Sequence, residues 1–179
     1  MRNSGVITGT SGIAMDLGLD DDTVEMADFS AVTGDILFGE RMDRLVIDGL
    51  TGAFSGSVDF GTGDDVFEVA GLSLMDGDWM FDAITEIYGG AGIDTLSFST
   101  DFATFLNEVT VSVLDAVTYA LRFGDAPAQL VFTDFETLRF SDGTYAMSDL
   151  APVPLPAGLW LMLSGLGGFA VMRRRKSVA

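Results

Sequence analysis

The sequence predicts an all-β protein: a short parallel β-solenoid with a C-terminal β cap, followed by a C-terminal hydrophobic helix. Two observations favour the solenoid. A turn motif rich in glycine and aspartate occurs four times within residues 17–97, and apolar residues with a period of two follow each copy. A turn followed by a short strand with one inward face is the repeating unit of stacked β coils. An uncharged apolar run near the C-terminus predicts the helix.

Residues 1–100 contain the repeat. Residues 89–97 match the pattern Gly-Gly-x-Gly-x-Asp-x-apolar-x at every defined position, and residues 60–68 match it at all but the first. Residues 17–25 and 38–46 are degenerate copies. The motif aspartates, separated by 21, 22 and 29 residues, are Asp22, Asp43, Asp65 and Asp94. With one motif per coil, we expect the turns to stack along one edge of the solenoid.

The residue types of the motif indicate an oxygen-ligand metal site. Glycines let a turn aim backbone carbonyls at one ion, and the aspartate adds negative charge. The candidate metal ligands in the two better copies are Gly61, Gly63, Asp65, Gly90, Gly92 and Asp94, and those in the degenerate copies are Asp22 and Asp43. Asp43 is the weaker candidate because Arg41 stands where a glycine is wanted. A structural turn without metal is the alternative at each copy.

The four copies resemble the calcium-binding nonapeptide repeats of RTX (haemolysin-type) proteins. The resemblance implies a parallel β-roll that binds Ca²⁺ between successive turns. The chain departs from the RTX pattern in one respect: RTX arrays place two motifs in each coil, on opposite edges, whereas here one motif recurs at the longer spacing. We therefore expect an RTX-like roll with one motif per coil.

Residues 101–150 are expected to form a terminal β region that caps the repeats. Residues 109–114 and 130–133 are rich in β-branched residues, and a turn at Asp142-Gly143 follows residues 135–140. Residues 132–150 resemble the segment that often closes RTX arrays. The sequence leaves open whether residues 101–107 form a short helix. Core packing explains the phenylalanines of this region more simply than a carbohydrate-binding platform does: Phe102, Phe105, Phe132, Phe135 and Phe140.

The last 27 residues have the order of a membrane-directed signal. Residues 151–156 form a linker, and the motif Val153, Pro154, Leu155, Pro156 and Ala157 leads into residues 157–179. That segment has 16 uncharged residues up to Met172 and ends with the basic cluster Arg173, Arg174, Arg175 and Lys176. Sixteen helical residues span about 24 Å, short of a hydrocarbon core of about 30 Å, so flanking residues must contribute to a span. A buried core helix is the alternative, and it fits the terminal cations poorly.

The tail resembles the VPLPA type of C-terminal sorting signal, a member of the PEP-CTERM group that exosortase-type membrane peptidases process. The resemblance implies export, a precursor held in the membrane by the C-terminal helix, removal of the tail, and delivery to the cell surface or extracellular matrix. Residues 1–10 lack the cationic and apolar regions of a secretory signal peptide. We therefore expect either that the true start lies upstream or that the chain is a C-terminal fragment.

Composition narrows the function classes. The chain has 27 acidic and nine basic residues, and four of the basic ones lie in the tail. So acidic a domain repels phosphate backbones, which excludes nucleic acid as a partner and favours cations. The chain contains no cysteine and no histidine, so disulfides, the usual zinc, copper and haem sites, and triads based on histidine are excluded. Calcium is the cation that suits the remaining oxygen ligands.

These observations predict an exported calcium-binding surface protein that is not an enzyme. Its expected partners are calcium ions, an exosortase-type sorting peptidase and the membrane. Two alternatives stay open. The chain is the C-terminal export and anchoring part of a larger RTX enzyme, or it is a surface adhesin or scaffold that binds a polysaccharide or another chain of the matrix.

Overall fold

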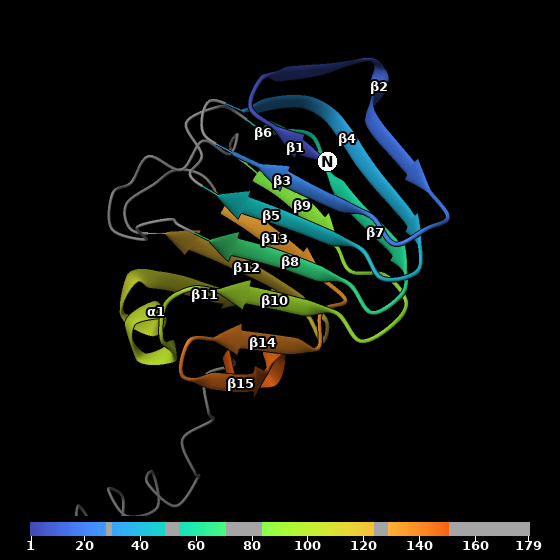
Figure 1. The fold of residues 1–179 in the computed structure, drawn as a ribbon. Coiled ribbons are helices and arrows are strands. Elements are labelled where there is room, and N and C mark those ends of the chain that lie inside the picture. Colours follow the sequence, from blue (N-terminus) through green and yellow to red (C-terminus); the bar gives the residue numbers. More distant parts are fainter. Residues whose placement is uncertain (28–29, 49–53, 71–83, 124–128, 151–179) are drawn as a thin grey trace, which may run out of the picture.

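The computed structural model describes residues 1–27, 30–48, 54–70, 84–123 and 129–150. Two β-sheets lie face to face in this part of the chain, and the hydrophobic core fills the space between them (Figure 1). Residues 151–179 lie outside the described residues, and so do the predicted linker, sorting motif, hydrophobic helix and basic end. Within the described residues, no helix has the length and apolar character that a membrane crossing requires.

The first sheet has seven strands in the order β1-β3-β5-β8-β10-β14-β15. Strand β1 follows the N-terminus, and each of the strands β3, β5, β8 and β10 follows one copy of the turn motif. The bounds are β1 Arg2–Asn3, β3 Thr23–Met26, β5 Arg44–Asp48, β8 Val66–Ala70, β10 Thr95–Phe98, β14 Thr137–Phe140 and β15 Gly143–Ala146.

The second sheet has eight strands in the path β11-β12-β13-β9-β7-β4-β2, with β6 paired to β4. The bounds are β2 Val6–Gly18, β4 Ala31–Glu40, β6 Phe54–Ser55, β7 Val58–Thr62, β9 Ile84–Tyr88, β11 Val109–Val113, β12 Thr118–Phe123 and β13 Gln129–Thr133. A helix, α1 Phe102–Glu108, precedes β11, and a 3₁₀ turn, η1 Met147–Leu150, follows β15.

The predicted fold class, a short parallel β-solenoid, is wrong. Both sheets mix parallel and antiparallel strands: β11, β12 and β13 pair antiparallel, and so do β14 and β15. The physical reason is the length of the connections. Residues 114–117 and 141–142 are tight turns, which join antiparallel neighbours, whereas a parallel pair needs a long crossover. The glycine-aspartate motif ends at β10, and these two connections after it are such turns.

The four motif copies bring their strands into parallel register. Thr23 pairs with Arg44, Arg44 with Val66, and Val66 with Thr95. The offsets between these partners equal the spacings of the motif aspartates, so equivalent turns lie side by side at one end of the first sheet (Figure 1).

The apolar residues two and four positions after each aspartate form the inner face of the first sheet. Examples are Leu45, Phe67 and Leu96, which are fully buried. Phe38 of β4 and Phe60 of β7 stack at 4.7 Å between ring centroids in the second sheet, and Phe132 meets Phe67 from the opposite layer. The predicted core role of the C-terminal phenylalanines is confirmed for Phe105, Phe132, Phe135 and Phe140, which are buried, while Phe102 packs against the core from its edge.

The helix α1 resolves the question that the sequence left open. Asp101 caps its N-terminus: the Asp101 side chain accepts hydrogen bonds from the backbone N–H and the hydroxyl of Thr104, at 2.9 and 2.8 Å. Aspartate at this position satisfies an N–H that has no partner within the helix. Phe105 anchors the helix against Phe98 and Phe140.

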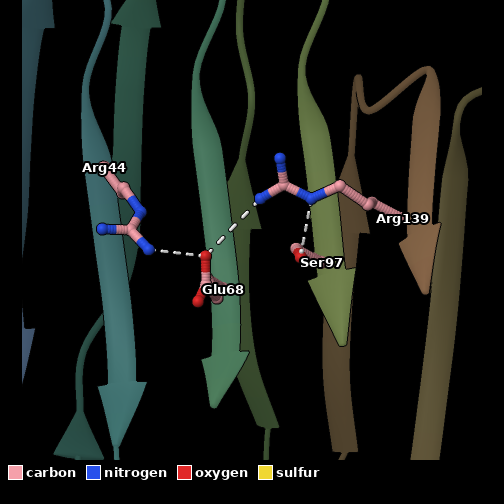
Figure 2. A network of polar contacts seen from close by, with 4 residues as sticks. All are labelled: Arg44, Glu68, Ser97 and Arg139. Atoms are coloured by element: carbon pink, nitrogen blue, oxygen red, sulfur yellow. Dashed lines mark hydrogen bonds and ion pairs between the residues drawn. The ribbon is translucent and has the colours of Figure 1, made fainter. Parts of the chain in front are cut away.

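A polar network crosses the outer face of the first sheet (Figure 2). Glu68 of β8 accepts from Arg44 of β5 at 2.7 Å and lies 3.5 Å from Arg139 of β14. Arg139 also donates to the hydroxyl of Ser97 on β10, at 3.1 Å. Exposed ion pairs contribute little stability each. In this network, two of the five arginines that precede the tail form ion pairs with the same residue, Glu68.

Candidate metal site

The turn aspartates form a hydrogen-bonded ladder, which we call the carboxylate ladder. The backbone N–H of each aspartate donates to the side chain of the next aspartate along the sheet. Asp22 N donates to Asp43 Oδ1 at 2.7 Å, Asp43 N to Asp65 Oδ1 at 2.6 Å, and Asp65 N to Asp94 Oδ1 at 2.8 Å. The structure therefore brings together all four aspartates that the sequence singled out.

Glu136 is a fifth rung that the sequence analysis missed. The Asp94 N–H donates to Glu136 Oε2 at 2.8 Å, and Thr95 pairs with Thr137 in parallel register. A sequence signal was present. Residues 136–140 read acid-Thr-Leu-x-Phe, as residues 94–98 do. The preceding glycines are missing from this copy, and the glutamate is one methylene longer than the aspartate, so the Gly-Asp pattern did not detect it.

One carboxylate oxygen on each inner rung has no partner. Asp43 is 1% exposed, and Asp65 and Asp94 are 0% exposed. Their Oδ1 atoms accept the ladder hydrogen bonds, while Oδ2 of each is buried without any hydrogen-bond partner. A buried carboxylate oxygen without a donor is costly unless it is protonated or binds a cation. Each inner rung therefore carries one oxygen that needs a proton or a cation.

Burial raises the pKa of the inner carboxyls. Desolvation is the largest cause at Asp65 and raises its pKa to about 7, although the hydrogen bond from Asp43 lowers it and the charges of Asp94 and Asp43 raise it further. Desolvation likewise raises the pKa of Asp94 to about 6, with added repulsion from Glu136. The pKa of Asp43 is also raised, chiefly by burial.

Glycines in the turns allow the close stacking that the ladder needs. Gly90 and Gly92 have φ angles of 96° and 157°, in the region that side chains disfavour. A Cβ on Gly90 would overlap the carbonyl oxygen of Gly61, and one on Gly92 would overlap that of Gly63. The glycines of one turn thus lie directly against the carbonyl oxygens of the equivalent glycines in the preceding turn. Arg41 stands at a glycine position of the motif, which made Asp43 the weaker candidate. Arg41 adopts a φ of 76°, and the hydrogen bond from Asp43 N to Asp65 Oδ1 is still formed.

Asp94 Oδ2 and the carbonyl oxygen of Asp134 lie beside Gly89. A Cβ on Gly89 would lie 2.6 Å from Asp94 Oδ2 and would overlap the carbonyl oxygen of Asp134. Only glycine keeps this small space open between a buried carboxylate oxygen and a carbonyl oxygen. Asp134 itself has a φ of 58°, which turns its backbone into this position.

The residues present fit calcium better than other metals. No three acidic side chains of the described residues converge on one point, so carboxylates alone do not make a site there. A mixture of carboxylate and backbone carbonyl oxygens is the donor set that calcium accepts, and magnesium demands a stricter geometry. Asp94 and the carbonyl of Asp134, which both lie beside Gly89, would hold the ion, with Asp65 on the adjacent rung.

No protein-family model and no curated protein matches this chain. The assignment of the site therefore depends on its geometry and chemistry.

Asp65→Ala and Asp65→Asn are expected to have different effects in the metal-free protein. The alanine leaves the buried Asp43 N–H without an acceptor, which costs about 1–3 kcal/mol. The asparagine keeps an acceptor and removes the charge, so it should be neutral or stabilising at pH 7. Urea unfolding in a chelator measures both free energies, with Asp59→Asn on the exposed face of β7 as the matched control. Equal losses for the two substitutions would contradict the role of Asp65 as an acceptor.

The metal-free protein should lose stability as the pH rises from about 4 to 7. The folded-state pKa values of Asp65 and Asp94 lie above the unfolded value of 3.8, so the folded state binds more protons in this window. The contribution of these two carboxyls to stability is then greatest below pH 4 and falls as the pH passes their folded pKa values. Urea midpoints at pH 4.5 and 7.5 in a chelator test this. The double change Asp65→Asn and Asp94→Asn should flatten the slope, and an unchanged slope would contradict the assignment.

Proposed function

We propose that this chain is an exported calcium-binding protein of the cell surface or extracellular matrix, and that calcium holds the stacked turns of its carboxylate ladder together. One observation carries the proposal: Oδ2 of Asp65 and Oδ2 of Asp94 are fully buried and have no hydrogen-bond partner. A cation bound at these oxygens removes the cost of burying them.

The choice of calcium is supported by the ligands that the chain offers. Without histidine and cysteine, the donors are oxygens, and the carbonyl of Asp134 lies close to the buried Oδ2 of Asp94. When bound, calcium would supply the positive charge that these oxygens lack. Calcium is millimolar outside cells, which suits a site of modest affinity on an exported protein.

The carboxylate ladder makes folding depend on its surroundings. In a cytosol low in calcium, Asp65 and Asp94 repel their acidic neighbours and are poorly solvated, which destabilises the stacked turns. The surplus of acidic residues adds repulsion over the whole surface and favours an open chain that can be exported. Outside the cell, the ladder residues acquire their cation and the turns close.

The C-terminal sequence supports the exported location. In this proposal Val153–Ala157 is the site that an exosortase-type peptidase recognises, residues 157–172 hold the precursor in the membrane, and Arg173–Lys176 remain in the cytoplasm. The chain has no catalytic role in this proposal. The absence of histidine and cysteine from its sequence supports that view.

Calcium should raise the melting temperature of the full-length chain in mild detergent. At a concentration 100 times the dissociation constant, a ligand of the folded state adds about 2.7 kcal/mol of stability. Differential scanning calorimetry in chelator and in 5 mM calcium, a concentration of the order found outside cells, measures the shift.

Two controls make the calcium result specific. The double change Asp65→Asn and Asp94→Asn should abolish the shift, whereas Asp59→Asn should keep it. Magnesium at the same concentration should have a much smaller effect. No shift with calcium, or an equal shift in the double variant, would refute the proposal.

Replacing Pro154 and Pro156 by alanine should block processing of the tail. In a Gram-negative host that contains an exosortase-type peptidase, the variant is expected to accumulate as an unprocessed membrane precursor, while the parent chain loses its tail and reaches the surface. Immunoblotting of membrane and surface fractions, with an epitope before residue 151, separates the two forms. Pro127→Ala is the matched control, and equal processing of all three chains would count against the sorting assignment.

A further inference from the structure

The N-terminal end of the stacked strands is open. Figure 1 shows β2 at the end of the second sheet, and within the described residues no strand pairs with its outer side. The same end exposes apolar side chains. Of the ten large hydrophobic side chains exposed in the described part of the chain, four lie in the first 19 residues: Met1 at 58%, Val6 at 75%, Ile13 at 43% and Leu19 at 65%. An open strand edge beside exposed apolar side chains is a typical interaction surface.

Two columns of glycines run through the stack, and both end uncovered. In the first column, a Cβ on Gly34 would overlap the carbonyl oxygen of Gly12, and one on Gly56 would overlap that of Gly34. In the second column, Gly39 lies in the same way against Gly18. Gly12 and Gly18 also have positive φ angles, of 97° and 105°, but a Cβ on either would meet no described residue within 4 Å. Each column therefore has a place for one more carbonyl oxygen.

The carboxylate ladder is open at the same end. The carboxylates of Asp43, Asp65 and Asp94 each accept the backbone N–H of the preceding rung. Asp22 is the first rung, and its half-buried carboxylate accepts no hydrogen bond from the part of the chain that the structure describes. The carboxylate of Asp22 is therefore available to the N–H of one further rung.

We propose that residues 12–22 bind a strand of a separate polypeptide, which pairs parallel to β2 and adds one rung to the carboxylate ladder. The chemistry of the partner follows from residues 34–43, which lie against this segment on its other side. They carry two glycines five residues apart and a backbone N–H four residues after the second glycine. In the partner, the two glycine carbonyls lie on Gly12 and Gly18, and the N–H donates to Asp22. The contact continues the interface that β2 already forms with β4.

A second copy of this chain does not fit this end of the stack. The strands that carry the pair of glycines, β4 and β7, already have neighbours on both sides, and the edge strands β11 and β15 lack the pair. Strand β2 has a free side, but two copies related by a two-fold axis would pair their β2 strands antiparallel. The carboxylate ladder needs parallel neighbours, because each N–H donates to the equivalent residue of the next turn. The partner is therefore a different chain.

A synthetic peptide with the sequence of residues 31–43 is the probe, because it carries both glycines and the backbone N–H of Asp43. Fluorescence anisotropy of the labelled peptide, with the full-length chain in mild detergent and calcium, should show saturable binding. The matched control is the same peptide with a methyl group on the Asp43 nitrogen, which removes the one N–H that reaches Asp22. The control should bind roughly tenfold more weakly, the loss expected for one hydrogen bond to a charged acceptor.

Variants of the full-length chain test the other side of the same contact. Asp22→Ala removes the acceptor and should weaken binding of the unmodified peptide by roughly tenfold, with no further loss for the methylated peptide. Asp22→Asn keeps a carbonyl oxygen and should retain most of the binding. Gly18→Ala should also weaken binding, because its Cβ would lie where the carbonyl of the peptide has to come. Arg41, with a φ of 76°, shows that a turn of this stack accepts a side chain at positive φ.

The outcomes separate the proposed contact from unspecific association. Circular dichroism checks that each variant is folded. Saturable binding that both N-methylation and Asp22→Ala weaken supports the proposal. No saturable binding, equal binding of the two peptides, or equal binding by the parent chain and the Asp22→Ala variant overturns it.

Discussion

The arrangement of the turns depends on one hydrogen bond that is repeated from rung to rung. Each turn has a backbone N–H at the residue just before a strand of the first sheet, and such an N–H needs an acceptor when it is buried. The carboxylate of the next turn supplies it, as in the bond from Asp65 N to Asp94 Oδ1. The acceptor must therefore stand at one fixed position before each strand. This requirement ties the position of the acidic residue to the register of the sheet.

The ladder has a direction, and that direction explains how it ends. Each rung donates toward the C-terminal neighbour, so Asp94 needs an acceptor that no further glycine-aspartate turn provides. Glu136, carried by the connection between β13 and β14, fills that role from 42 residues away. Beyond Glu136 the chain turns back at Asp142-Gly143 into the antiparallel strand β15. The last strand in parallel pairing, β14, is thus covered by the antiparallel strand β15 and not by the strand of a further turn motif.

The sequence was sufficient where local chemistry and period determine structure. The apolar positions after each aspartate predicted the short strands, and the spacing of 21, 22 and 29 residues predicted which residues pair. It failed at the strand pairings that follow the repeat. Residues 109–113 read as a strand, but nothing in them specifies an antiparallel partner. Asp134 reaches the space beside Gly89 because of its backbone conformation, which no pattern of residue types encodes.

The choice of carboxylates at the rungs is itself informative. An asparagine side chain has a carbonyl oxygen that could accept the same backbone N–H without a charge to desolvate. The ladder nevertheless uses aspartate at four rungs and glutamate at the fifth, and burial raises the pKa of three of them. A hydrogen-bond acceptor alone does not account for that cost. The second oxygen of each inner aspartate, buried without a partner, is the part that an asparagine amide could not replace as a ligand for a cation. This cost is the reason for proposing that hydrogen bonds hold the ladder in register and that its charged oxygens bind a cation.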